Sequence, residues 1–139
     1  MTELGILAQE RMEAIRAVNQ QLDGRLAGAV DAMDVESAAE CFLDSTDLVV
    51  VMGGAVLRGS AELRQFLVRM LSGARRARLN IAPVARYQVD DTVFALETAT
   101  YELEKLDGEK VTWEERWLDA RQNVAGRWVY TVLQASQAV

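Results

Sequence analysis

The chain has 139 residues, of which 50% are hydrophobic and 26% are charged, and its formal net charge is −6. These values are typical of one soluble globular domain over residues 1–139, and they argue against nucleic acid or an anionic membrane as the main partner. With no histidine and one cysteine, Cys41, the chain lacks the residues for a His-assisted nucleophile, a His-ligated metal or an internal disulfide. We expect a cytoplasmic protein, because the sequence has no leader pattern and no apolar run of membrane-spanning length.

The first half of the sequence predicts three helices. Asp34 is placed to cap the second, and Ser60 to cap a third that ends at Gly73. Gly24 and Gly28 weaken the last turns of the first helix. Its apolar stripe recurs every three to five positions, at Leu4, Leu7, Met12, Ile15, Val18, Leu22, Leu26 and Val30.

The remaining segments predict strands. An apolar run over 48–52 is followed by a Gly53-Gly54 turn and a short return strand over 55–57. A long segment over 75–89 contains Pro83, which indicates a bulge or an edge strand. Asp107-Gly108 predicts a two-residue type I′ turn that joins two strands of an antiparallel meander. Its strands are expected over 75–89, 92–106, 110–122 and 127–135, which makes the fold class α+β.

This layout resembles the nuclear transport factor 2-like superfamily, and within it the SnoaL-like and ketosteroid-isomerase-like small domains. The resemblance covers essentially the whole chain and depends on the order and spacing of several landmarks rather than on one motif. It implies a curved antiparallel sheet wrapped around the long first helix into a cone, with a pocket at the wide end. The landmarks are Asp34, Val56-Leu57-Arg58-Gly59, Gly126-Arg127-Trp128, and Ala82-Pro83 with the following strand to Asp91, which is similar to the calcium/calmodulin-dependent kinase association domain.

The sequence also departs from these families. Their members often carry histidines near the end of the last strand, where this chain has Val132 and Gln134. Ketosteroid isomerases place a tyrosine on the first helix, and this helix has none. The catalytic machinery of neither group is therefore transferred to this chain, and the fold alone does not name a function.

The predicted turn at Asp107-Gly108 determines which residues share a face of the sheet. With two turn residues, Glu97 pairs with Leu118. Periodicity does not decide which face lines the cone, but Arg116 falls where the kinase association domain keeps a pocket arginine. This resemblance implies that one set of four residues points inward: Glu97, Tyr101, Glu114 and Arg116.

Two interpretations of this set remain open. In the first, Arg116 keeps one carboxylate ionised and polarises a ligand carbonyl or carboxylate, while Glu97 or Glu114 acts as general acid or base. In the second, Glu97 and Arg116 form a structural ion pair without catalysis. Tyr130 and Gln134 share a face of the last strand by parity, and they either bind the ligand there or serve packing and hydrogen bonding only.

Three functions from different classes fit these observations. The first is a cofactor-independent acid–base enzyme of the isomerase, cyclase or dehydratase type, acting on a lipophilic carbonyl or carboxylate compound. The others are a non-catalytic pocket for a small lipophilic molecule and a homodimeric association module. We expect neither a metal nor another cofactor. An outer sheet face carrying Phe94, Leu96, Trp113 and Trp117 predicts a homodimer.

Overall fold

The computed structural model describes the backbone of residues 3–137, and the side chains of residue 13 and of residues 16–137. Four positions of the predicted helical stripe, Leu4, Leu7, Met12 and Ile15, therefore lie outside the described side chains. The helices are α1 (Glu3–Asp31), α2 (Val35–Ala39) and α3 (Gly59–Ser72). The strands are β1 (Val49–Met52), β2 (Ala55–Arg58), β3 (Ala74–Val89), β4 (Thr92–Lys105), β5 (Lys110–Val124) and β6 (Arg127–Gln137).

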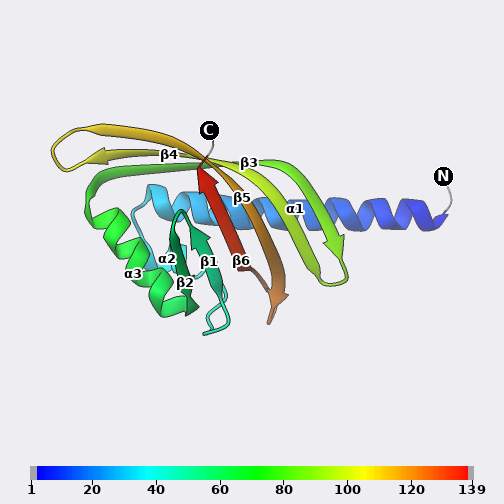
Figure 1. The fold of residues 1–139 in the computed structure, drawn as a ribbon. Helices are drawn as coiled ribbons and strands as arrows, with labels where there is room; N and C mark the ends of the chain where they lie inside the picture. The colour runs from blue at the N-terminus through cyan, green and yellow to red at the C-terminus, as the bar shows by residue number, and fades with distance from the viewer. Residues whose placement is uncertain (1–2, 138–139) are drawn as a thin grey trace.

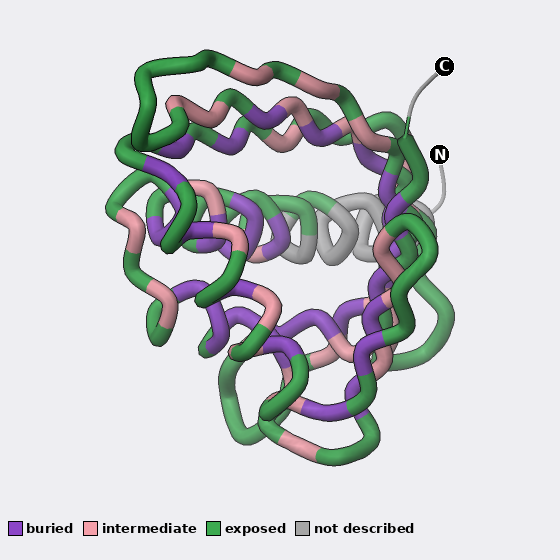
Figure 2. The backbone as a smooth tube through the Cα atoms, turned by 60° about the vertical axis from the view of Figure 1, so that its left-hand side comes forward, coloured by how far each residue is buried: buried purple, intermediate pink, exposed green. Residues whose placement is uncertain are grey.

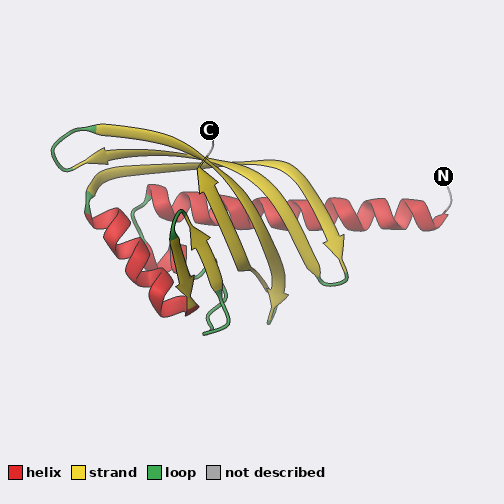
Figure 3. Cartoon of the chain, viewed as in Figure 1, coloured by secondary structure: helices red, strands yellow, loops and turns green. Residues whose placement is uncertain are grey.

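The six strands form one curved, unclosed sheet in the order β2-β1-β6-β5-β4-β3, and α1 lies along its concave side (Figures 1 and 3). Strands β3 to β6 form the predicted antiparallel meander. The parallel pairing of β1 with β6, in which Val50 faces Leu133, was not predicted. The α+β cone expected from the sequence is confirmed.

Local chemistry accounts for the starts of the two shorter helices. The Asp34 carboxylate accepts a hydrogen bond from the Ser37 amide at 3.1 Å, so Asp34 is the predicted cap of α2. The prediction for Ser60 is wrong: α3 begins one residue earlier, at Gly59, and the Ser60 hydroxyl donates to Asp44 instead. Gly59 has φ +84°, and an added Cβ there would lie 3.3 Å from the Thr46 Cα, so the turn into α3 requires glycine.

The hairpin between β4 and β5 has three loop residues rather than the predicted two. The amide of Lys105 donates to the Glu109 carbonyl at 2.8 Å, and the Gly108 amide donates to the Lys105 carbonyl at 2.9 Å. Gly108 has φ +90°, while Asp107 keeps a negative φ, which is the geometry of a three-residue loop rather than a type I′ turn. Glu97 therefore pairs with Trp117 and not with Leu118.

This one-residue slip reverses the predicted orientation of every β5 side chain, because side chains alternate between the two faces of a strand. Glu114 and Arg116 lie on the outer face and are exposed, while Trp117 is only 2% exposed and faces α1. Along the tube in Figure 2 the buried and exposed positions alternate in the same way. The inward placement of Glu97 and Tyr101 is confirmed, and that of Glu114 and Arg116 is wrong.

A second irregularity, in β6, places Tyr130 and Gln134 on opposite faces of the sheet. Ala120 pairs with Val132 but Arg121 pairs with Tyr130, so β6 carries an extra residue at this point, a β-bulge. Tyr130 is consequently buried on the inner face, whereas Gln134 is exposed on the outer face. The bulge predicted near Pro83 is confirmed by the register shift between Pro83 and Ala85.

The outer face of the sheet leaves large apolar side chains in solvent. They occupy adjacent positions on β3 to β6, and each is more than 40% exposed. We call this set the outer apolar patch: Tyr87, Phe94, Leu96, Leu118 and Val132. The expectation that Trp113 and Trp117 lie on this face is wrong: Trp117 is buried on the inner face, and Trp113 is stacked on the inward-facing Tyr101. Within the described residues, no helix has the length and hydropathy needed to cross a membrane.

Candidate functional site

Charged and polar side chains are buried between α1 and the inner face of the sheet, on one side of the cone. Asp23 comes from α1, where it shares the sheet-facing stripe with Leu22 and Leu26. The other members come from four different strands and stand on the inner face because of the register described above. We call this set the ionic cluster: Asp23, Arg86, Glu97, Asp119, Arg121 and Tyr130.

Arg121 lies at the centre of the cluster and is fully buried. Its guanidinium holds the Asp119 carboxylate through two hydrogen bonds of 2.9 and 3.0 Å, and Nη2 reaches Glu97 Oε1 at 2.5 Å. On the helix side, Nη1 donates to the Asn19 carbonyl at 3.2 Å and lies 3.0 Å from Asp23 Oδ1. One side chain therefore connects β5, β4 and α1.

Asp23 accepts hydrogen bonds from two other elements, β6 and β3. The Tyr130 hydroxyl donates to Asp23 Oδ1 at 2.5 Å, and Arg86 Nη2 donates to Oδ2 at 2.9 Å. Arg86 Nη2 also lies 3.6 Å from Glu97 Oε2, an oxygen that accepts no hydrogen bond from the described residues. Arg86 Nη2 therefore lies close to both the Asp23 and the Glu97 carboxyl groups.

The charges of the cluster favour a proton on one of its carboxyl groups. Three carboxylates against two guanidiniums leave a formal charge of −1 in a site shielded from water. Burial, followed by the hydrogen bond with Glu97, raises the pKa of Asp23 from 3.8 to about 7. Burial also raises the pKa of Glu97 and that of Asp119. Burial opposes the charge on Arg121, but Asp119, Glu97 and Asp23 raise its pKa, so it stays a cation.

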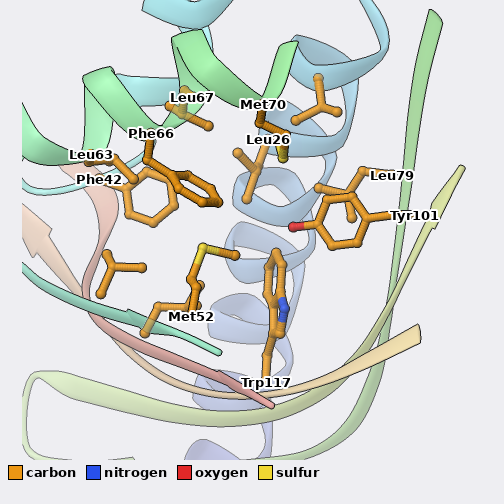
Figure 4. A pocket seen from close by; sticks show the side chains of 13 residues that line it. Leu26, Phe42, Met52, Leu63, Phe66, Leu67, Met70, Leu79, Tyr101 and Trp117 are labelled. Carbon is orange, nitrogen blue, oxygen red and sulfur yellow. The ribbon is translucent and has the colours of Figure 1, made fainter. Parts of the chain in front are cut away.

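An apolar cavity of about 20 Å³ lies beside the cluster, between α3, α1 and the sheet (Figure 4). Met52, Phe66 and Met70 are half-buried, whereas the deeper residues such as Leu26 and Trp117 are buried. Space of this size accommodates little more than one water molecule. The lining residues come from both sheet and helices: Leu26, Val30, Phe42, Val50, Met52, Leu63, Phe66, Leu67, Met70, Leu79, Tyr101, Trp117 and Leu133.

Tyr101 gives this cavity its one polar group that is not already hydrogen-bonded within the described part of the chain. Its ring stacks on Trp113 at a centroid distance of 4.8 Å, and its hydroxyl oxygen points into the cavity (Figure 4). The Trp117 indole N–H donates to Glu115 Oε1 at 3.0 Å and is therefore already engaged. Burial, then the charge of Glu115, raises the pKa of Tyr101, which keeps the phenol neutral.

The residues expected from the sequence are thus divided among three places. Glu97 and Tyr130 lie in the ionic cluster, Tyr101 lines the cavity, and Glu114, Arg116 and Gln134 are exposed on the outer face. Their roles in catalysis or binding stay predictions. No group of three or more described metal-ligating side chains is arranged to hold an ion.

The sequence interpretation missed Asp23, Arg86, Asp119 and Arg121. A signal for Asp23 was present, because a charged residue stands between Leu22 and Leu26 on the apolar face of the first helix. Asp119 and Arg121 alternate in phase with Trp113 and Trp117, which indicates a buried face carrying charge. Arg86 follows the bulge at Pro83, so the face of the sheet on which it lies could not be predicted without knowing the register of β3 against β4.

No protein-family model and no curated protein matches the chain in sequence. Solved structures are similar to it in fold. A variant of a protein of unknown function from Mycobacterium tuberculosis has a TM-score of 0.80 and 19% identity, covering 99% of this chain and 78% of that one. A nuclear transport factor 2-like superfamily protein from Salmonella enterica has a TM-score of 0.79 and 15% identity, over 90% of this chain and 94% of its own.

A hexachlorocyclohexane dehydrochlorinase is also similar, with a TM-score of 0.78 and 14% identity over 92% of this chain and 88% of its own. At these identities the likeness concerns the fold. The chain has the nuclear transport factor 2-like fold, which confirms the resemblance noted in the sequence.

The ionic cluster predicts a large difference between two arginines of β5. Arg121→Met leaves buried carboxylates without their central cation, so we expect it to lower the free energy of unfolding at pH 7 by about 3–5 kcal/mol. Arg116→Met removes an exposed guanidinium that has no ion pair among the described residues, and we expect a loss below about 1 kcal/mol. Urea denaturation of both variants measures this difference. Equal losses would contradict the observed register.

The raised pKa of Asp23 predicts that the protein loses stability as pH rises. A carboxyl that binds its proton more tightly in the folded state contributes fully below its unfolded value of 3.8, and this contribution disappears as pH rises through about 7. We expect the free energy of unfolding to fall between pH 5 and pH 8 in the wild type, and to fall less in Asp23→Asn. Asp91→Asn, at an exposed turn, is the matched control. Identical pH slopes in wild type and Asp23→Asn would refute the assignment.

Proposed function

We propose that this protein binds a small, largely apolar molecule in the cavity between α3, α1 and the inner face of the sheet. The observation that carries the proposal is the lining of the cavity. Twelve of its side chains are apolar or, like Trp117, already hydrogen-bonded, and they surround the Tyr101 hydroxyl, which has no hydrogen bond to a described residue. Apolar walls with few polar groups are typical of sites for small molecules. The fold shared with a dehydrochlorinase supports a binding role, although it does not identify a ligand.

The residues at the mouth of the cavity are suited to make room for such a molecule. Met52 comes from β1, and Phe66 and Met70 come from α3, so a ligand enters between the strand and the helix (Figure 4). All three are half-buried, so their ends already face solvent. Methionine side chains are flexible and polarisable, and they adapt to ligands of irregular shape. Their displacement enlarges a cavity that is nearly filled when they point inward.

A second candidate is acid–base chemistry by Asp23 and Glu97, which replaces the pair Glu97 and Glu114 considered from the sequence. Asp23 stands one helical turn from Leu26, and Glu97 pairs across the strands with Trp117. Leu26 and Trp117 both line the cavity, and Asp23 and Glu97 are neighbours of these two residues that do not themselves line it. A carboxyl whose pKa is about 7 exchanges a proton readily near neutral pH, which suits removal of a proton next to a carbonyl.

We also propose that two copies of the chain associate through the outer apolar patch. The exposed area of its five side chains is on the order of 400 Å², which is within the range of the largest patch on a monomer, a patch that is often functional. A stable dimer buries about 800 Å² per partner, so the patch is large enough for the apolar centre of such an interface. Arg116 and Gln134 lie beside the patch and would form part of a polar rim.

Binding in the cavity is tested with methylenecyclohexane as the probe. In protein labelled at the methionine methyl groups, we expect saturable NMR shifts at Met52 and Met70. Met70→Ala removes a side chain from the mouth, so the Met52 signal should report affinity that is several-fold higher. Val68→Ala, on the exposed side of the same helix, serves as the control and should leave affinity unchanged. The proposal fails if no saturable shift occurs up to the solubility limit of the probe.

Acid–base chemistry is tested by following deuterium exchange at the carbons next to the carbonyl of cyclohexanone in D₂O. We expect the wild type to accelerate exchange beyond the buffer rate, because the Asp23–Glu97 pair accepts and returns the proton. Asp23→Asn should return the rate to that of buffer, while Asp91→Asn should behave as the wild type. Equal rates in the wild type and Asp23→Asn would remove the chemistry and leave the binding proposal intact.

Self-association is tested by sedimentation equilibrium at tens of micromolar protein. We expect a dimer for the wild type and a monomer for Leu118→Lys, which places a charge in the centre of the outer apolar patch. Leu106→Lys, at the exposed tip of the β4–β5 hairpin, should remain dimeric. A wild-type monomer, or a dimer that persists in Leu118→Lys, would rule out this interface.

A further inference from the structure

Tyr101 holds its hydroxyl at a fixed position inside the cavity. The side chain is 4% exposed, and its ring is stacked on Trp113 at an interplanar angle of 9°. Trp117 packs against the same ring at a centroid distance of 6.4 Å. Two large aromatic neighbours therefore prevent the phenol from swinging out to reach solvent. The hydroxyl stays directed at the space between α3 and α1 (Figure 4).

No residue that the structure describes forms a hydrogen bond with this hydroxyl. The hydroxyl oxygen is not fully enclosed by protein but faces the cavity, so its donor is available to an acceptor placed there. A trapped water is a poor partner here, since an ordered buried water needs two to four polar contacts and the cavity wall supplies one. An acceptor atom of a ligand would instead give the Tyr101 hydroxyl its hydrogen-bond partner.

The surroundings of the hydroxyl also restrict the charge of that ligand. The lining contains no cationic side chain, because Arg121 is engaged within the ionic cluster and Arg116 is on the outer face. A carboxylate placed here would be buried without a compensating charge, which is far more costly than burying a neutral group. A neutral carbonyl oxygen accepts from the phenol without that penalty.

We propose that Tyr101 is the specificity-determining residue of the cavity, and that the ligand is a compact neutral compound whose single acceptor oxygen, of the ketone or aldehyde type, binds the Tyr101 hydroxyl. This inference rests on the proposed function, since it assigns a chemical class to the ligand of the same cavity. It narrows the carbonyl or carboxylate compound expected from the sequence to a carbonyl compound.

The test compares two probes of nearly equal shape, cyclohexanone and methylenecyclohexane, which differ in whether an acceptor oxygen is present. Affinities come from the methyl shifts of Met52 and Met70. We expect the wild type to bind cyclohexanone about five- to tenfold more tightly than its hydrocarbon analogue, the worth of one hydrogen bond between neutral groups. In Tyr101→Phe this preference should disappear, with the affinity for methylenecyclohexane held within about twofold.

Tyr87→Phe, which removes an exposed phenol from the outer face, is the matched control and should keep the preference. A thermal unfolding midpoint for Tyr101→Phe at or above that of the wild type would show that the hydroxyl is not needed for folding. If both probes bind the wild type equally, the inference is overturned while the cavity remains a binding site. If neither probe binds, the proposed function fails as well. The comparison of probes in the wild type decides the matter even if Tyr101→Phe does not fold.

Discussion

A guanidinium buried without exposure to water must have its charge neutralised and its donors accepted by the protein, and Arg121 meets this demand with three carboxylates and a helix carbonyl. Because Asp119 and Glu97 lie on neighbouring strands and Asp23 lies on α1, their contacts with Arg121 hold the helix at one position along the sheet. The register of β4 against β5 follows the same constraint, since a slip of one residue would turn Arg121 and Asp119 out of the cone.

The ionic cluster divides the concave face of the sheet into two environments. On one side, charged side chains pair with one another, and burial raises the pKa of Asp23 to about 7. On the other side, α3 and the sheet enclose apolar side chains around the Tyr101 hydroxyl. Trp117 stands at the boundary, paired with Glu97 and lining the cavity.

The order of elements, the capping role of Asp34 and the α+β class were readable from the sequence, because they depend on local periodicity and turn chemistry. The orientation of β5 was not, since it depends on whether the loop near Asp107 contains two residues or three. That single difference exchanged Glu114 and Arg116 for Asp119 and Arg121 on the inner face. The prediction from strand alternation was wrong in β6 as well, because the bulge places Tyr130 and Gln134 on opposite faces of the sheet. Bulges and loop lengths are set by tertiary contacts, which no local pattern records.

The most direct test of this account is the pH titration of the Asp23 side-chain carbon by NMR, in protein labelled with ¹³C at the aspartate carboxyl groups. Burial beside Glu97 predicts a carboxyl signal with an apparent midpoint near pH 7, whereas the Asp34 cap, whose pKa is lowered by its hydrogen bonds with Ser37, titrates in the acid range. Assignment through Asp23→Asn identifies the signal. A midpoint for Asp23 below pH 5 would contradict a protonated carboxyl pair at the centre of the fold.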